Sequence, residues 1–189
     1  MNKNIVFDVA HDFLSFIRNP AFDPIKQRDE IAKVLSPFVG VDESIFQYGI
    51  KRPQPPDRTR TIFYSPELLF LLSRFDTDFR LPVHNHEAWN ILLICSGTMH
   101  FRWYRRVDNG AEPGKAKVEL ADDRIVKAGE LGIVAQPPND IHQLEILTPG
   151  TWMLTVAPCY EPDVRDIHNP PQGTFERKPL AVLPAGVAA

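Results

Sequence analysis

The chain has few cysteines, little net charge and no long apolar run. Its two cysteines, Cys95 and Cys159, are too few for a disulfide framework. A net charge of −3 provides no basic surface for nucleic acid or for an anionic membrane. The apolar stretch ELLFLLSRF is interrupted by Arg74, far short of the length that crosses a bilayer. We therefore expect a globular protein that binds neither nucleic acid nor a membrane.

The N-terminal residues MNKNIVFDVAHDF also lack the long apolar core of a signal peptide. Together with the low cysteine content, this predicts a cytoplasmic protein with reduced thiols. The 189 residues, of which 43% are hydrophobic, are enough for one domain with its own core. A small molecule is the expected partner.

Apolar residues recur at helical spacing near the N-terminus, where residues 8–18 and 23–35 each place them on one face. They are Val9, Phe13, Phe16 and Ile17 in the first stretch and Ile31, Val34 and Leu35 in the second. Asp23 and Pro24 supply an N-cap and a first helical residue. His11 has no second metal donor near it and is expected at the surface. Residues 1–50 are therefore predicted to form a helical cap.

The sequence changes character after the proline-rich connector KRPQPPDRTR at residues 51–60. From Thr61 onward, short β-branched or aromatic runs alternate with turn residues, which is typical of an antiparallel sandwich or barrel. We predict a β-barrel over 58–160. The segment 161–189 is rich in proline and is predicted to be an irregular tail of the same single domain, 1–189.

Three histidines stand out in the β-rich part. His84 and His86 are two residues apart, so in an extended strand both side chains project from one face. His142 lies on another β-rich segment and supplies a third nitrogen donor. Imidazole ligands suit Fe(II), Zn, Cu or Ni. The spacing therefore predicts a metal site made of these three residues.

The residues around these histidines form a more specific pattern than the His84–His86 pair alone. His84 and His86 are followed by Asn90 and Gly97, and His142 ends the pattern P-x-N-x-x-H that begins at Pro137. This resembles the two motifs of the cupin superfamily. The resemblance implies a mainly β fold, a double-stranded β-helix (jelly-roll) barrel, with one divalent metal inside.

Two departures from the cupin pattern carry information. Asn90 stands where cupins have a glutamate ligand, and Glu87 would point to the opposite face of a regular strand. Asn139 stands where the pattern has a glycine. Among residues other than glycine, asparagine best tolerates a left-handed turn. Asn90 is therefore expected to orient a histidine or a bound water rather than to bind the metal.

A three-histidine cupin without the glutamate resembles the cysteine dioxygenase group. The resemblance implies Fe(II) as cofactor, with Zn, Ni, Cu or Mn as other divalent choices, and a small thiol and O2 as substrates that yield a sulfinate. Arg60 in RTRTIFY matches the arginine that grips the substrate carboxylate in that group. The resemblance also implies a monomer or homodimer.

The match to the cysteine dioxygenases is incomplete at the last barrel strand. Their Ser-His-Tyr relay is missing, because WMLTVAPCY places Thr155 and Ala157 at those positions, with Tyr160 just beyond. The expected substrate is a small thiol carboxylate such as cysteine or 3-mercaptopropionate, and the missing relay favours substrates other than cysteine. Two alternatives stay open: a three-histidine dioxygenase that cleaves a carbon skeleton such as a β-diketone, and a cupin that binds a metal or small ligand without catalysis.

The remaining candidate residues have simpler expectations. His100 and Tyr160 are expected behind the metal ligands, and His168 at the surface. Cys95 is expected to be a small buried hydrophobe. The large aromatic residues of the β region are expected in the barrel core: Trp89, Phe101, Trp103 and Trp152.

Overall fold

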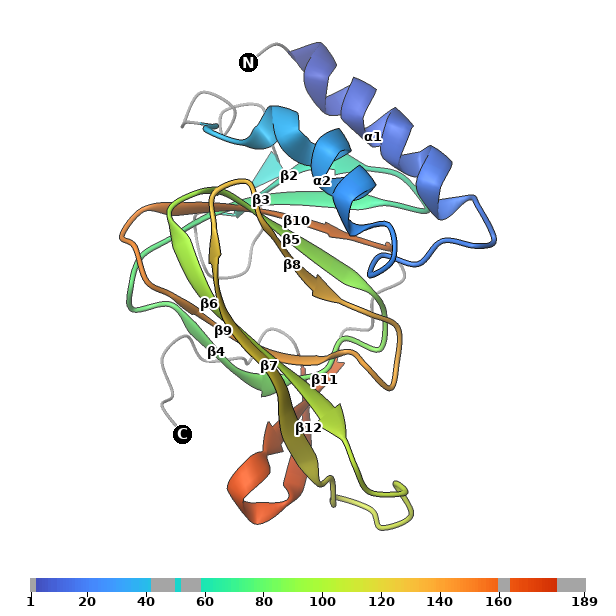
Figure 1. Cartoon of the computed structure of the whole chain (residues 1–189), viewed down its shortest axis with the longest axis vertical. Coiled ribbons are helices and arrows are strands. Elements are labelled where there is room, and N and C mark those ends of the chain that lie inside the picture. Colours follow the sequence, from blue (N-terminus) through green and yellow to red (C-terminus); the bar gives the residue numbers. More distant parts are fainter. Residues whose placement is uncertain (1–2, 42–49, 52–58, 160–163, 180–189) are drawn as a thin grey trace.

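Two six-stranded antiparallel sheets form the body of the protein (Figure 1). The computed structural model describes residues 3–41, 50–51, 59–159 and 164–179. One sheet has the order β1-β2-β3-β10-β5-β8 and the other β12-β11-β4-β9-β6-β7. The predicted mainly β fold is therefore confirmed.

The strands of the first sheet are β1 (Ile50–Lys51), β2 (Thr59–Tyr64), β3 (Leu69–Phe75), β5 (Asn90–Ser96), β8 (Leu131–Val134) and β10 (Thr151–Ala157). Those of the second are β4 (Arg80–His84), β6 (Thr98–Arg106), β7 (Val118–Lys127), β9 (Ile141–Ile146), β11 (Val164–Asn169) and β12 (Thr174–Pro179). The helical elements are α1 (Lys3–Ile17), α2 (Arg28–Leu35) and the short turns η1 (Ser36–Phe38) and η2 (Pro170–Gln172).

Alternation along the strands divides the apolar side chains into two cores. On β10, Met153 belongs to the core between the sheets, whereas Leu154 and Val156 face the helices. On β5, Leu92 faces inward and Leu93 outward in the same way. The first sheet is thus buried on both faces, which explains why the sequence of β5, NILLICS, is almost continuously apolar.

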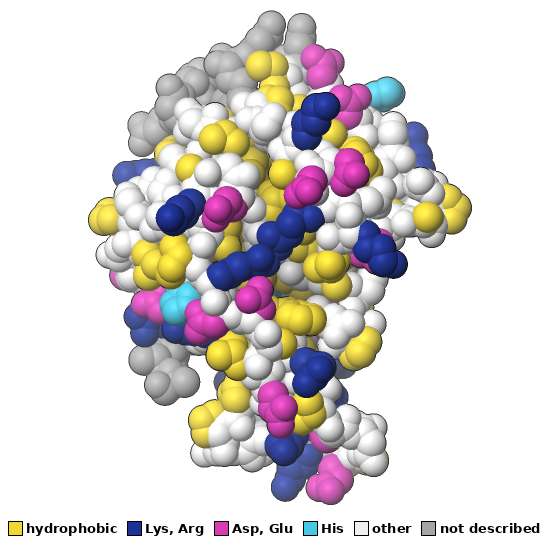
Figure 2. Space-filling model, viewed as in Figure 1, with side chains coloured by type: hydrophobic (Ala, Val, Ile, Leu, Met, Phe, Trp, Pro, Cys, Tyr) yellow, Lys and Arg dark blue, Asp and Glu magenta, His cyan; other side chains and the backbone are white. Residues whose placement is uncertain are grey.

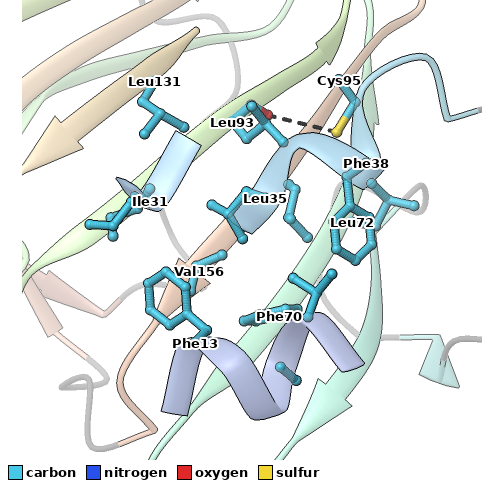
Figure 3. Close-up of a cluster of buried hydrophobic side chains, with 14 of the residues drawn as sticks. Phe13, Ile31, Leu35, Phe38, Phe70, Leu72, Leu93, Cys95, Leu131 and Val156 are labelled. Atoms are coloured by element: carbon cyan, nitrogen blue, oxygen red, sulfur yellow. Dashed lines mark hydrogen bonds between the residues drawn. The ribbon is translucent and has the colours of Figure 1, made fainter. Parts of the chain in front are cut away.

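Helices α1 and α2 cover the outer face of the first sheet (Figure 1). Figure 3 shows Phe13 of α1 beside Phe70 and Val156, with Leu35 of α2 beside Leu93. Phe13 is fully buried, and its ring contacts that of Phe70 edge to face at 6.1 Å. The predicted helical cap is present in the described part of residues 1–50.

The second helix begins later than predicted. Asp23 Oδ1 accepts the N–H groups of Ile25 and Lys26 at 3.0 and 3.2 Å, so the expected N-cap residue closes a separate turn. The helix proper starts at Arg28 and runs to Leu35.

The prediction of an irregular tail is wrong for residues 164–179. β11 and β12 pair with each other and extend the second sheet, since Ile167 of β11 pairs with His84 of β4. His168 is correspondingly buried, not at the surface, and its ring lies 5.8 Å from that of Phe175. Polar residues fill this hairpin, so its sequence lacks the apolar runs that marked the other strands.

The expected aromatic core is divided between the two sides of the first sheet. Phe101 lies between the sheets, and Trp103 is half-buried against the same core. Trp89 and Trp152 pack instead in the helix-facing cluster, where Cys95 is also fully buried (Figure 3). Burial raises the pKa of the Cys95 thiol to about 12, as expected for a small buried hydrophobe.

Acidic and basic side chains are interspersed over the face seen in Figure 2. This agrees with the small net charge of −3. Among the described residues, no helix has the length and apolar character needed to cross a bilayer.

Candidate metal centre

Three histidine side chains meet inside the barrel. The Nε2 atoms of His86 and His142 are 2.9 Å apart, and each lies 3.2 Å from Nε2 of His84. All three residues are buried, at 1 to 9% exposure. The structure therefore brings together the three residues that the spacing singled out.

Strand pairing positions two of the three rings. His84 ends β4, and its Cα partner on the adjacent strand β9 is His142. Directly paired residues of an antiparallel sheet share a face, so both rings project from the same side. Phe101 of β6, which belongs to the core between the sheets, lies 5.3 Å from the His142 ring.

His86 reaches the site from a turn rather than from a strand. β4 ends at His84, and Glu87 adopts a left-handed φ of 55°. Asp140 Oδ2 accepts the N–H groups of His86 and Glu87 at 3.2 and 2.7 Å. The two-residue spacing was thus the right signal, although the strand geometry assumed for it applies only to His84.

The two departures from the cupin pattern have different outcomes. Glu87 Oε1 accepts from Arg177 Nη2 at 2.6 Å, and the carboxylate is directed away from the histidines. Asn139 does not take the left-handed conformation expected of it, because Glu87 is the one non-glycine residue with positive φ in the described chain. Its carbonyl oxygen instead accepts from Trp103 Nε1 at 2.9 Å.

Neighbouring groups orient two of the imidazoles. His84 Nδ1 lies 2.9 Å from the Pro82 carbonyl, which only accepts, so Nδ1 carries the proton and Nε2 a lone pair. His86 Nδ1 lies 3.2 Å from the Asn90 amide. When His86 Nε2 is a ligand, Nδ1–H donates to Asn90 in the rotamer that presents Oδ1. The Asn90 side chain is therefore placed to orient the His86 ring.

The donor set fits a transition-metal ion. A metal held at about 2.0–2.1 Å by three nitrogens on one side separates them by about 3 Å, as observed for the three Nε2 atoms. Burial, followed by the charges of His84, His86 and Arg165, lowers the pKa of His142 well below its ordinary value. A neutral imidazole is the form that binds metal. His84, His86 and His142 would hold such an ion.

A buried arginine lies beside this centre. Arg165 on β11 is 1% exposed. Ile167 pairs with His84, the Asn85 N–H donates to the Asp166 carbonyl at 3.2 Å, and Arg165 precedes Asp166 on β11. Its charge is also among those that lower the pKa of His142. Arg165 also shares the inward face with Ile167, two residues on. A fixed positive charge therefore lies next to the three histidines.

Arg60, the predicted carboxylate-binding residue, is not brought to this centre. It pairs with Leu72, which packs in the helix-facing cluster, so Arg60 emerges on that face of β2. The adjacent Thr59 faces the barrel interior, where its hydroxyl lies 2.9 Å from that of Ser73. The choice of face depends on strand pairing, which a one-residue shift reverses. The prediction for Arg60 is wrong on this geometry.

His100 is also far from the expected position. Its neighbours Met99 and Phe101 fill the core between the sheets, so His100 projects from the outer face of β6. There its Nε2 pairs with Asp123, and its Nδ1 lies 3.1 Å from Arg102 Nη2. Tyr160 lies outside the described residues.

Two residues of the centre were missed in the sequence, Arg165 and Asp140. Arg165 lies in DVRDIHN, a polar segment without the apolar alternation that identifies a buried strand. Asp140 precedes His142 by two residues, and this proximity to a proposed ligand was the available signal.

Comparison with known proteins concerns the fold. No protein-family model matches the chain, and no curated protein matches it either. A solved RmlC-like cupin from Shewanella frigidimarina is 19% identical over 54% of this chain and 76% of its own, with a TM-score of 0.39. A protein with a double-stranded β-helix domain from Klebsiella pneumoniae is 13% identical over 71% and 93%, with a TM-score of 0.41.

A third solved structure is hydroquinone 1,2-dioxygenase from Sphingomonas sp. TTNP3 with 4-hydroxybenzoate bound. It is 9% identical, covers 52% of this chain and 63% of its own, and has a TM-score of 0.40. At such values, a function for this chain has to come from the side chains of its own site.

Proposed function

We propose that the protein is an Fe(II)-dependent dioxygenase that oxidises the thiol of a small thiol carboxylate, of the cysteine or 3-mercaptopropionate type, to a sulfinate. The observation that carries the proposal is the buried Arg165 beside the three histidines. Three histidines alone would suit several metals and several oxidations. A fixed guanidinium next to them selects an anionic substrate.

The charge balance of the site supports an anion. Three imidazole ligands bring no negative charge to a divalent ion, and Arg165 is a buried cation beside them. The buried Asp140 carboxylate accepts from two backbone N–H groups and is not one of the three ligands. A thiol carboxylate that binds as its dianion brings two negative charges. Its thiolate would face the metal, and its carboxylate would face the Arg165 guanidinium. Arg165 replaces Arg60 in the role of carboxylate anchor.

Each part of the site has a task in the reaction. His84, His86 and His142 would hold Fe(II), which supplies the redox chemistry by which dioxygen oxidises a thiolate. Arg165 would orient the substrate through its carboxylate, in bidentate fashion. The surrounding apolar side chains, such as Phe101 at 5.3 Å from His142, exclude bulk water from the reacting sulfur.

The reaction balances without a further reductant. The thiolate loses four electrons and gains both oxygen atoms of one O2, which gives the sulfinate. The thiol proton is lost to solvent when the thiolate forms. The chain therefore needs no internal acid to complete the overall transformation, consistent with the absence of the relay residues at Thr155 and Ala157.

The proposal is tested by oxygen uptake with the iron-loaded protein and a panel of substrates. We expect uptake with 3-mercaptopropionate or cysteine, one O2 consumed per sulfinate formed. Uptake with a β-diketone and with no thiol would replace the proposal by the carbon-skeleton dioxygenase. Full iron occupancy with no uptake on any substrate would favour a cupin that binds a metal or ligand without catalysis.

A further inference from the structure

The turn that carries His86 depends on a carboxylate outside the ligand set. Asp140 is 3% exposed and lies two residues before His142. Its Oδ2 accepts the backbone N–H groups of His86 and Glu87 at 3.2 and 2.7 Å. One side chain therefore ties the turn of His86 to the segment that delivers His142.

The same turn holds a backbone conformation that L residues rarely adopt. Glu87 has φ of 55°, whereas every other described residue with positive φ is a glycine. A side-chain-bearing residue persists in this region only where its surroundings hold it there. The two hydrogen bonds to Asp140 are buried and charge-assisted, so they are strong enough to do this.

An outer contact adds to the restraint on the turn. Arg177 of β12 donates from Nη2 to Glu87 Oε1 at 2.6 Å and from Nε to Asp166 Oδ1 at 2.8 Å. The Arg177 side chain is 56% exposed, so solvent screens these ion pairs. Asn85 is held by β11 as well, because its N–H donates to the Asp166 carbonyl at 3.2 Å and its Oδ1 accepts from the Asp166 N–H at 2.9 Å. The contacts of Asp140 are the buried restraint on the backbone of His86 and Glu87 themselves.

We propose that Asp140 is a positioning residue that fixes the turn 85–87 before metal binds, so that His86 Nε2 is already beside His84 and His142. Without it, the turn relaxes toward an ordinary conformation and carries the His86 ring away. The metal would then have to reorder the turn on binding, which weakens its affinity. This inference rests on the proposed metal site but not on the thiol chemistry.

The test is the affinity for Co(II), measured anaerobically by visible absorption on the full-length protein. Asp140→Ala is expected to weaken Co(II) binding about 10- to 100-fold, the usual cost of removing a group that supports a metal ligand. Asp140→Asn keeps an oxygen acceptor in the same place and is expected to restore most of the affinity. Asp78→Ala, which removes an exposed carboxylate elsewhere, is the matched control and should bind as the native protein does.

Rescue by asparagine separates positioning from a general effect on folding. Wild-type affinity in Asp140→Ala would overturn the inference, as would equal losses in Asp140→Ala and Asp140→Asn. If the alanine variant does not fold, Asp140→Ser takes its place, because the shorter hydroxyl cannot reach both N–H groups. Failure of the native protein to bind Co(II) would instead remove the metal site itself, and with it the proposed function.

Discussion

Replacement of Arg165 by methionine separates the two arginines proposed for substrate binding. Arg165 is 1% exposed and lies close enough to His142 to lower its pKa, whereas Arg60 emerges on the helix-facing side of β2. Methionine keeps much of the side-chain volume and removes the charge. The native arginine should therefore matter for an anionic substrate and not for a neutral one.

The size of the effect follows from one charged hydrogen-bonded contact. Such a contact is worth about 1.5 to 3 kcal/mol, which corresponds to about a 10- to 150-fold loss of kcat/KM. We expect this loss for 3-mercaptopropionate, and little change for the uncharged thiol 2-mercaptoethanol. Most of it should appear in KM, because the carboxylate lies away from the reacting sulfur.

Oxygen uptake by the iron-loaded variants provides the assay, and near-ultraviolet circular dichroism checks that each is folded. Arg60→Ala is the matched control and should leave both substrates unaffected. Equal losses with the charged and the uncharged thiol would remove Arg165 from the carboxylate site. A selective loss in Arg60→Ala would refute the placement of Arg60 outside the barrel interior.

Two further predictions concern the fold around the site. Gly97 has φ of 86°, and a Cβ there would overlap Thr151 Oγ1 and lie 3.1 Å from Thr151 Cα. Gly97→Ala should therefore lower the free energy of unfolding, measured by urea denaturation, by about 2 kcal/mol or more. An unchanged urea midpoint would contradict this. Burial is the main cause that lowers the pKa of His168, so the unfolded chain binds a proton more readily and stability should fall as the pH drops below about 6.5. His168→Phe should lose less stability than the native protein over that range, and an identical pH dependence would show that another group is responsible.

The sequence contained most of the metal centre but little of its surroundings. Motif spacing identified His84, His86 and His142, because ligands of one metal ion must converge on one point and this requirement fixes their spacing in the sequence. Short β-branched or aromatic runs separated by turn residues predicted the barrel, but they did not predict that its first sheet is buried on both faces. The helical periodicity predicted a cap, whose second helix begins at Arg28 after a turn closed by Asp23.

The parts that could not be predicted depend on pairing between distant segments. The face of β2 that Arg60 occupies is set by its register with β3, where the structure has an irregularity between Thr61 and Phe63. The strand β11 has a polar sequence, and it becomes a buried strand only because it joins the second sheet beside β4. Arg165 is placed beside the histidines by that pairing.

The metal content of purified protein tests the central claim most directly. Plasma mass spectrometry on protein reconstituted anaerobically with Fe(II) should find one iron per native chain, since the three Nε2 atoms lie 2.9 to 3.2 Å apart inside the barrel. His142→Ala removes one of three ligands and should retain almost none after gel filtration. Equal iron in the native and His142→Ala proteins would contradict the site.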